Sequence, residues 1–118
     1  MRTQRLHTDR RMSQIVIHQG TVYLSGQVGE SMEAGIEQQT RETLQEIEKL
    51  LAEAGSDKEH ILSVTIYLKD IERDFGGMNA VWDRWLPEGV APARATVEAG
   101  MCESDILVEM SVIAAQRE

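Results

Sequence analysis

The chain lacks a second cysteine, a long apolar run and an excess of basic residues. Its only cysteine, Cys102, excludes an internal disulfide and is typical of a reducing compartment, so we expect a cytoplasmic protein. No run approaches the roughly 20 apolar residues of a membrane-spanning helix. The N-terminal residues also lack the apolar segment that is typical of a signal peptide. We therefore expect neither a membrane anchor nor export.

Basic residues are outnumbered, with 12 Lys and Arg against 20 Asp and Glu and a formal net charge of -8. Such a charge repels phosphate backbones and anionic membrane surfaces. One basic segment, Arg2 to Arg11, lacks the interleaved aromatic residues on which single-strand binders stack bases. We interpret it as a solvent-exposed strand, and we expect no nucleic-acid or membrane partner.

The residue spacings of a metal site and of a phosphate loop are also missing. His7, His18 and His60 stand at no ligand spacing, so no metal site is expected. The pair Gly76-Gly77 lacks the lysine of a P-loop and more simply permits close helix packing. Cys102 would need a histidine base to act as a nucleophile, and a partly buried, unreactive thiol is the favoured interpretation.

Hydrophobic periodicity predicts one domain over residues 1–118, because no linker, repeat or low-complexity segment interrupts it. Alternating β-rich runs predict strands at residues 15–18, 21–25, 61–69, 94–98 and 106–114. Three- and four-residue spacing predicts a long helix over 34–54, ended by Gly55, and a short helical turn over 56–59.

A second helix is predicted with Asp74 as its N-cap. Its apolar stripe, which we expect to be mostly core, consists of Phe75, Met78, Val81, Trp82 and Trp85. Two helices can cover only one face of a sheet, so the expected fold class is α+β with a mixed sheet. Because the strands carry apolar residues on both sides, for example Ile66 and Tyr67, we expect an oligomer that buries the second face.

Arg94 is the first candidate binding residue. Pro92 fixes its own φ and biases Ala91 toward extended geometry, so the backbone that enters the next strand has little freedom. A guanidinium matches a carboxylate with two parallel hydrogen bonds and stays charged, so Arg94 is a natural anchor for a small organic acid. The alternative is an ordinary surface salt bridge.

Glu109 is the second candidate. It stands between Val108 and Met110 in an apolar strand, where carboxylates are rare unless they are paired or functional. The alternative is a solvent-facing or salt-bridged strand residue.

Four short motifs, in order along nearly the whole chain, carry a family resemblance. They are Ser25-Gly26-Gln27, Met78-Asn79-Ala80, Pro92-Ala93-Arg94 and the run from Val108 to Ala114. With them the chain resembles the Rid family, the YjgF-type or RutC-like reactive intermediate deaminases formerly called endoribonuclease L-PSP. The resemblance implies a chorismate-mutase-like α+β fold with both helices on one face. It also implies a homotrimer whose sheets face inward, with three ligand clefts between subunits.

The resemblance also implies a reaction and a set of site residues. Arg94 matches the arginine that clamps the substrate carboxylate, and Glu109 matches the glutamate that orients or activates water. Ser25 and Gly26 match positions that line the same cleft, and Asn79 matches a helix residue near it. The implied reaction hydrolyses a 2-imino or enamino acid, such as 2-aminoacrylate, to a 2-oxo acid and ammonia, without a cofactor because the imine is already electrophilic.

Three positions depart from the family pattern and indicate a divergent branch with an altered pocket. Met12 stands at the position of a cleft tyrosine, Thr96 at the position of a cysteine, and Ser111 at the position of a second acid. A trimer that binds small carboxylates such as 2-oxo acids, or acts like a chaperone without turnover, therefore remains the alternative function. RNA cleavage, a name long attached to the family, is disfavoured by the charge of -8.

Overall fold

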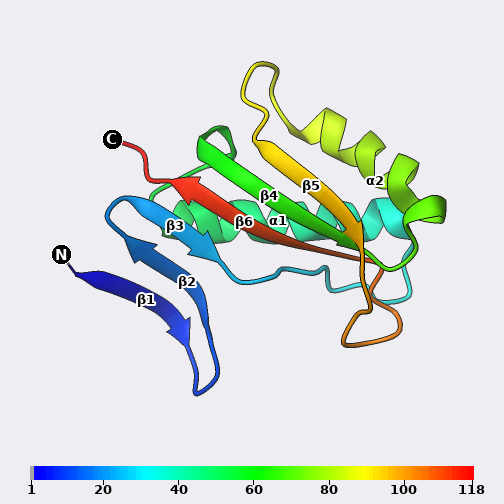
Figure 1. Ribbon diagram of the computed structural model, residues 1–118, viewed down its shortest axis with the longest axis horizontal. Helices are drawn as coiled ribbons and strands as arrows, with labels where there is room; N and C mark the ends of the chain where they lie inside the picture. The colour runs from blue at the N-terminus through cyan, green and yellow to red at the C-terminus, as the bar shows by residue number, and fades with distance from the viewer. Residues whose placement is uncertain (1) are drawn as a thin grey trace.

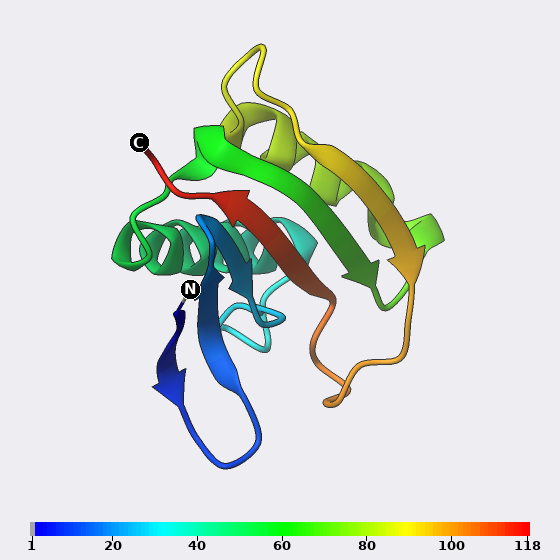
Figure 2. The same cartoon turned by 60° about the vertical axis from the view of Figure 1, so that its left-hand side comes forward.

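Six strands form one mixed sheet, and two helices lie on one of its faces, in the computed structural model, which describes residues 2–118 (Figures 1 and 2). The strands are β1 (Thr3–Thr8), β2 (Ser13–His18), β3 (Thr21–Leu24), β4 (Ile61–Leu68), β5 (Ala93–Glu98) and β6 (Val108–Ala115). The helices are α1 (Ile36–Glu53) and α2 (Ile71–Trp85), and a short 3-10 turn, η1 (Lys58–His60), precedes β4. The predicted α+β class is confirmed.

The strand order β1-β2-β3-β6-β4-β5 contains one parallel pair, β4 with β5, and antiparallel pairs elsewhere. A parallel pair needs a crossover connection, and α2 supplies it between β4 and β5. The last strand, β6, lies between β3 and β4 and so joins the N-terminal strands to the β4-α2-β5 unit (Figure 2). The basic N-terminal segment forms the edge strand β1, as predicted.

The core lies between the sheet and the helices. Val64, Ile66 and Leu68 on β4 are buried on that side, whereas Thr65 and Tyr67 point to the other face, as the alternation predicted. The helices contribute a matching set of buried apolar residues: Leu44, Ile47, Leu50 and Leu51 from α1, with Met78, Val81 and Trp82 from α2. Apolar burial of this kind is the main driving force that holds the helices on the sheet.

The helix α1 begins at Ile36, two residues later than predicted, and its C-terminal end agrees with the sequence except for the cap of the next turn. Gly55 has φ +78°, the left-handed conformation that ends a helix most readily at glycine. The following turn is capped by Asp57, whose carboxylate accepts from the Glu59 N–H at 3.0 Å, and not by Ser56. Ser56 instead donates to the carbonyl oxygen of Ala115 at 2.6 Å and so ties the loop to β6.

The start of α2 corrects the sequence prediction. The N-cap is Asp70, whose side chain accepts from the Arg73 N–H at 3.0 Å, and Asp74 lies inside the helix, only 3% exposed. The buried stripe therefore runs from Asp74 through Met78 at helical spacing, which leaves Phe75 beside the stripe and 43% exposed. Asp74 is tolerated there because the Arg73 guanidinium donates to both of its oxygens, at 2.9 and 3.1 Å.

Gly77 allows the two helices to approach closely, as the sequence suggested for the glycine pair. A Cβ at Gly77 would lie 2.7 Å from Cγ2 of Ile36 at the start of α1. The neighbouring Gly76 has no heavy atom within 4 Å of its Cβ position, so the close approach depends on one of the two glycines.

The face of the sheet away from the helices, here called the open face, carries half-exposed apolar side chains. Val16, Tyr23 and Ile113 lie side by side across β2, β3 and β6, and Tyr23 and Ile113 are among the exposed large apolar residues. Val97 adds to this surface on β5. The predicted burial of this face in an oligomer stays a prediction. Within residues 2–118, neither helix has the length and apolar character needed to cross a membrane.

Glu42 ties the loop before α1 to the helix. Its carboxylate accepts from the backbone N–H groups of Glu30 and Ser31, from the Ser31 hydroxyl, and from the Gln38 amide, at 2.7 to 2.9 Å. The Gln38 amide and then the Ser31 donors lower the pKa of Glu42 from 4.5 to about 2. Hydrogen bonds to the ionised form have this effect because protonation would remove acceptors.

This pKa shift predicts an acid-dependent contribution to stability. Because the pKa is lower in the folded state, the contribution of Glu42 is fully present above pH 4.5 and is lost as the pH falls toward about 2. We expect Glu42→Gln to have a lower thermal unfolding midpoint than wild type at pH 7. At pH 3 the difference between the two midpoints should be smaller, because part of the wild-type carboxylate is then protonated. The control is Glu46→Gln, one turn later in α1, which accepts none of these bonds. The prediction would be contradicted if the difference in unfolding midpoint between Glu42→Gln and wild type were the same at pH 7 and pH 3.

Candidate functional site

Glu109 lies against the backbone of Gly26. Two backbone hydrogen bonds, Gln27 N–H to Met110 C=O at 2.9 Å and Met110 N–H to Gln27 C=O at 3.0 Å, hold the segment after β3 beside β6. A Cβ on Gly26 would lie 2.1 Å from Oε2 of Glu109, far inside van der Waals contact. The carboxylate therefore occupies space that only a glycine leaves open.

A glutamine pair holds Ser25 next to this contact. The Ser25 hydroxyl and the Gln27 amide both donate to Oε1 of Gln14, at 2.8 Å each. Gln27 is only 7% exposed, so its amide is largely withdrawn from water and used within the fold. Gln14 and Gln27 were not among the predicted site residues. Gln27 belongs to the Ser25-Gly26-Gln27 motif, but no sequence pattern indicated that Gln14 would contact Ser25, 11 residues away.

A hollow of about 260 Å³ opens beside Glu109. It is lined by Tyr67, Ala99, Gly100, Met101, Glu109 and Ser111. Tyr67 is the direct neighbour of Glu109 across β4 and β6, so its phenol lies on the same face as the carboxylate. The sequence placed Tyr67 on this face without marking it as a site residue. Ser111, one of the departures from the family pattern, lines the same hollow.

Arg94 lies on the other side of the sheet. It is the β5 neighbour of Val64, whose side chain faces the helices. Its guanidinium carbon is 5.2 Å from the centre of the Trp82 ring on α2, a cation–π arrangement. Among residues 2–118 no acidic side chain lies within ion-pair distance of Arg94, so the surface salt bridge is not found within the chain. Trp82 was predicted only as core.

Thr96 and Asn79, two other predicted residues, lie on β5 and on α2. Thr96, two residues along β5, faces the same way, and its hydroxyl is buried with no hydrogen-bond partner in the described chain. Asn79 lies on α2, one turn before Trp82, and is partly buried.

The predicted site residues thus form two separate groups. Ser25, Gly26 and Glu109 lie at the open face, and Arg94 and Thr96 lie on the helix face. Because β4 runs between β5 and β6, the two strand backbones are about 10 Å apart, and their side chains point to opposite sides. One chain does not bring Arg94 and Glu109 together, so the predicted cleft needs two chains.

Two further residues of interest, Met12 and Cys102, lie in connecting segments between strands. Met12 is 44% exposed in the turn between β1 and β2, where the Asp9 carboxylate accepts from its N–H at 2.9 Å. Cys102 is exposed, not partly buried as predicted, because it lies in the loop between β5 and β6. In the part of the chain that the structure describes, no three His, Cys, Asp or Glu side chains are arranged to hold a metal ion.

Comparison with known proteins agrees with this geometry over nearly the whole chain. The family model described as Endoribonuclease L-PSP matches residues 2–116. The RutC family protein YoaB of Escherichia coli K12 is 41% identical over 111 residues, which cover 94% of this chain and 96% of that protein. A RutC family protein of Haemophilus influenzae is 40% identical over 115 residues, covering 97% and 98%.

The chain belongs to the RutC/YjgF family. Solved structures of similar proteins share its fold. NMB1025 of Neisseria meningitidis, a member of the YjgF protein family, has a TM-score of 0.92 at 40% identity, over 100% of this chain and 98% of that one. A protein of Pseudomonas aeruginosa has a TM-score of 0.94 at 40% identity, over 98% and 100%. The predicted family resemblance is therefore confirmed.

The Gly26–Glu109 contact predicts a specific energetic coupling. We expect Gly26→Ala to destabilise the protein by about 1 kcal/mol, the low end of the cost of overpacking, because the new methyl group must displace the Glu109 carboxylate, which is the end of a flexible side chain beside a hollow. In a Glu109→Ala background the same substitution should cost much less, so a double-mutant cycle measured by chemical denaturation should show the coupling. Gly76→Ala, in open space on α2, is the matched control and should be neutral or stabilising. An equal cost of Gly26→Ala in both backgrounds would argue against the contact.

Proposed function

We propose that this RutC/YjgF family member hydrolyses small 2-imino or enamino acids to 2-oxo acids and ammonia, in clefts between the subunits of a homotrimer. The observation that carries the proposal is the position of its two candidate residues. Arg94 has no acidic partner within residues 2–118, and Glu109 borders a hollow on the opposite face. A cleft between two copies would join a free cation to a carboxylate at an accessible surface.

The open face supports assembly through the sheet. It carries exposed Tyr23, Ile113 and Val97, and no helix covers it (Figure 2). Exposed apolar surface of this kind is typical of a protein interface. β5 is an edge strand, so the Arg94 side of one copy can approach the Glu109 side of another.

The proposed chemistry uses these residues in separate roles. Arg94 binds the substrate carboxylate with two parallel hydrogen bonds, and the Trp82 ring beneath the guanidinium restricts its orientation. An enamine first becomes an imine by gaining a proton at carbon and losing one from nitrogen. Water then adds to the imine carbon, while Glu109 accepts one proton from that water and passes it to nitrogen, which gives a carbinolamine. The remaining proton, on the carbinolamine hydroxyl, moves to nitrogen through Glu109 as the C–N bond breaks, so the carbonyl of the 2-oxo acid forms and ammonia leaves. The electrophile is the substrate itself, so no cofactor is required.

Replacing the anchor should abolish turnover. With imines generated by an amino-acid oxidase, we expect Arg94→Ala to slow 2-oxo acid formation by about 100-fold or more, because the imine carbon is no longer held in one pose. Arg10→Ala, at an exposed position in the turn between β1 and β2, removes the same charge and should leave the rate unchanged. Undiminished turnover in Arg94→Ala would reject the assignment.

Mixing two inactive variants tests whether the site is shared between chains. Arg94→Ala and Glu109→Ala should each be inactive alone. If each cleft takes Arg94 from one chain and Glu109 from another, random mixing by co-refolding at equal amounts should restore about a quarter of the wild-type clefts. A site within one chain would give no recovery, since every chain lacks one residue.

A carboxylate-binding protein without turnover is the second candidate. The feature that favours it is the altered pocket chemistry, since Ser111 lines the hollow beside Glu109 and the Thr96 hydroxyl has no described partner. Binding of a 2-oxo acid that depends on Arg94, without any imine hydrolysis, would support this function. The family model carries the name of an endoribonuclease, but the net charge of -8 opposes RNA binding.

A further inference from the structure

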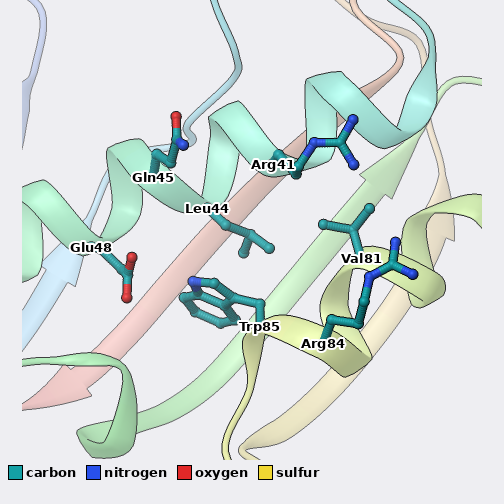
Figure 3. A pocket seen from close by; sticks show the side chains of 7 residues that line it. All are labelled: Arg41, Leu44, Gln45, Glu48, Val81, Arg84 and Trp85. Carbon is teal, nitrogen blue, oxygen red and sulfur yellow. The ribbon is translucent and has the colours of Figure 1, made fainter.

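A second hollow lies between the two helices, on the side away from the open face. Its volume is about 290 Å³, and its lining residues are Arg41, Leu44, Gln45 and Glu48 from α1, with Val81, Arg84 and Trp85 from α2. Figure 3 shows these side chains in front of the sheet, in the groove where the helices run past each other. This groove, here called the interhelical groove, contains none of the residues of the proposed deaminase site.

The two ends of the interhelical groove differ in charge. Figure 3 shows the guanidinium groups of Arg41 and Arg84 at one end, and the Glu48 carboxylate at the other. Arg84 forms no ion pair with any described acidic residue. The ion pair of Arg41 with Glu37 is long, at 3.9 Å, and Nε of Arg41 donates to the neutral Gln38 amide oxygen at 3.1 Å. Two cations from different helices therefore face one space with little compensation.

Apolar side chains form the middle of the groove. Leu44 and Val81 are buried beneath it, and the Trp85 ring forms one wall. The ammonium of Lys58 lies 5.2 Å from the centre of the Trp85 ring and 3.4 Å from Glu48, so this end is already neutralised within the fold. The indole N–H of Trp85 is buried without a hydrogen-bond partner in residues 2–118, although buried indole groups usually have one.

We propose that the interhelical groove binds a small monocarboxylate with an apolar or aromatic body. The carboxylate would accept hydrogen bonds from Arg41 and Arg84, and the body would pack on Leu44 and against Trp85. A volume of about 290 Å³ is at the small end of ligand sites, which suits a metabolite of this size. The Glu48–Lys58 ion pair at the far end offers a second carboxylate no unpaired cation, so the site favours monocarboxylates over dicarboxylates.

The charges and the position of the groove favour this ligand over other occupants. A purely apolar partner would leave two guanidinium groups beside it without an anion, at a cost in desolvation. An inorganic anion would gain nothing from the apolar middle. The groove also stays accessible if the open face is buried by other copies of the chain, because it lies on the opposite side of the sheet (Figure 2).

Binding of phenylacetate, followed by nuclear magnetic resonance, tests the proposal independently of any turnover. With the full chain labelled with ¹⁵N, we expect the indole N–H signal of Trp85 to shift saturably, with a dissociation constant of about 1 mM or below. Arg41→Gln/Arg84→Gln should weaken this binding about tenfold or more. Arg10→Gln/Arg11→Gln, which removes the same charge from the exposed turn between β1 and β2, should leave it unchanged.

Two further binding experiments distinguish ligand binding in the interhelical groove from ligand binding at Arg94. Phenylacetate should shift the Trp85 signal equally in Arg94→Ala, and phenethylamine, which replaces the carboxylate by an ammonium, should not produce the saturable shift. Loss of the Trp85 shift in Arg94→Ala, equal binding in the double arginine variant, or no saturable shift would overturn the proposal. A shift of the same signal with protein concentration alone would mark the groove as an interface between copies and would also overturn it.

Discussion

The antiparallel ladder that β6 forms with β3 on one side and β4 on the other is the interaction on which the rest of the structure depends. The last strand of the chain enters the middle of the sheet and joins two parts that are otherwise separate in sequence. Its alternation sends Val108, Met110 and Val112 into the core and leaves Glu109 on the open face. The same hydrogen bonds, extended by Gln27, bring Gly26 against the carboxylate.

This ladder also separates the two predicted catalytic residues. Adjacent residues in paired strands share a face, so Glu109 lies with Tyr67 on the open side, whereas Arg94 lies with Val64 on the helix side. The chain thus places the two candidate residues on surfaces that point away from each other. The proposed reaction therefore requires the assembly of more than one chain.

The helix side of the sheet contains a series of cation–π and aromatic contacts in addition to the apolar core. Arg94, Trp82, Trp85 and Lys58 form a continuous series of contacts, with a cation over a ring at each end and ring centres 5.5 Å apart between them. Tryptophans that the periodicity marked as core residues thus also position cations at the surface. The interhelical groove lies directly beside this series, because Trp85 belongs to both.

Much of the fold was predictable because it follows from local patterns. The alternation of β4, the left-handed Gly55 and the long helix α1 each depend on neighbouring residues, and all were predicted correctly. Asp74 was misassigned as a cap because either of two aspartates could begin the helix, and only the buried contact with Arg73 distinguishes them. The contact of Gln14 with Ser25 and the position of Tyr67 beside Glu109 could not be predicted from the sequence, because both depend on strand register.

The family, the α+β class and the candidates Arg94 and Glu109 could be predicted from the amino-acid sequence, because periodicity and short motifs are properties of neighbouring residues. The three-dimensional arrangement was needed to show that these two residues lie on opposite faces, that Gly26 makes room for a carboxylate, and that two arginines line one groove. Each of those facts depends on which strand or helix lies beside which. That order comes from long-range pairing and packing.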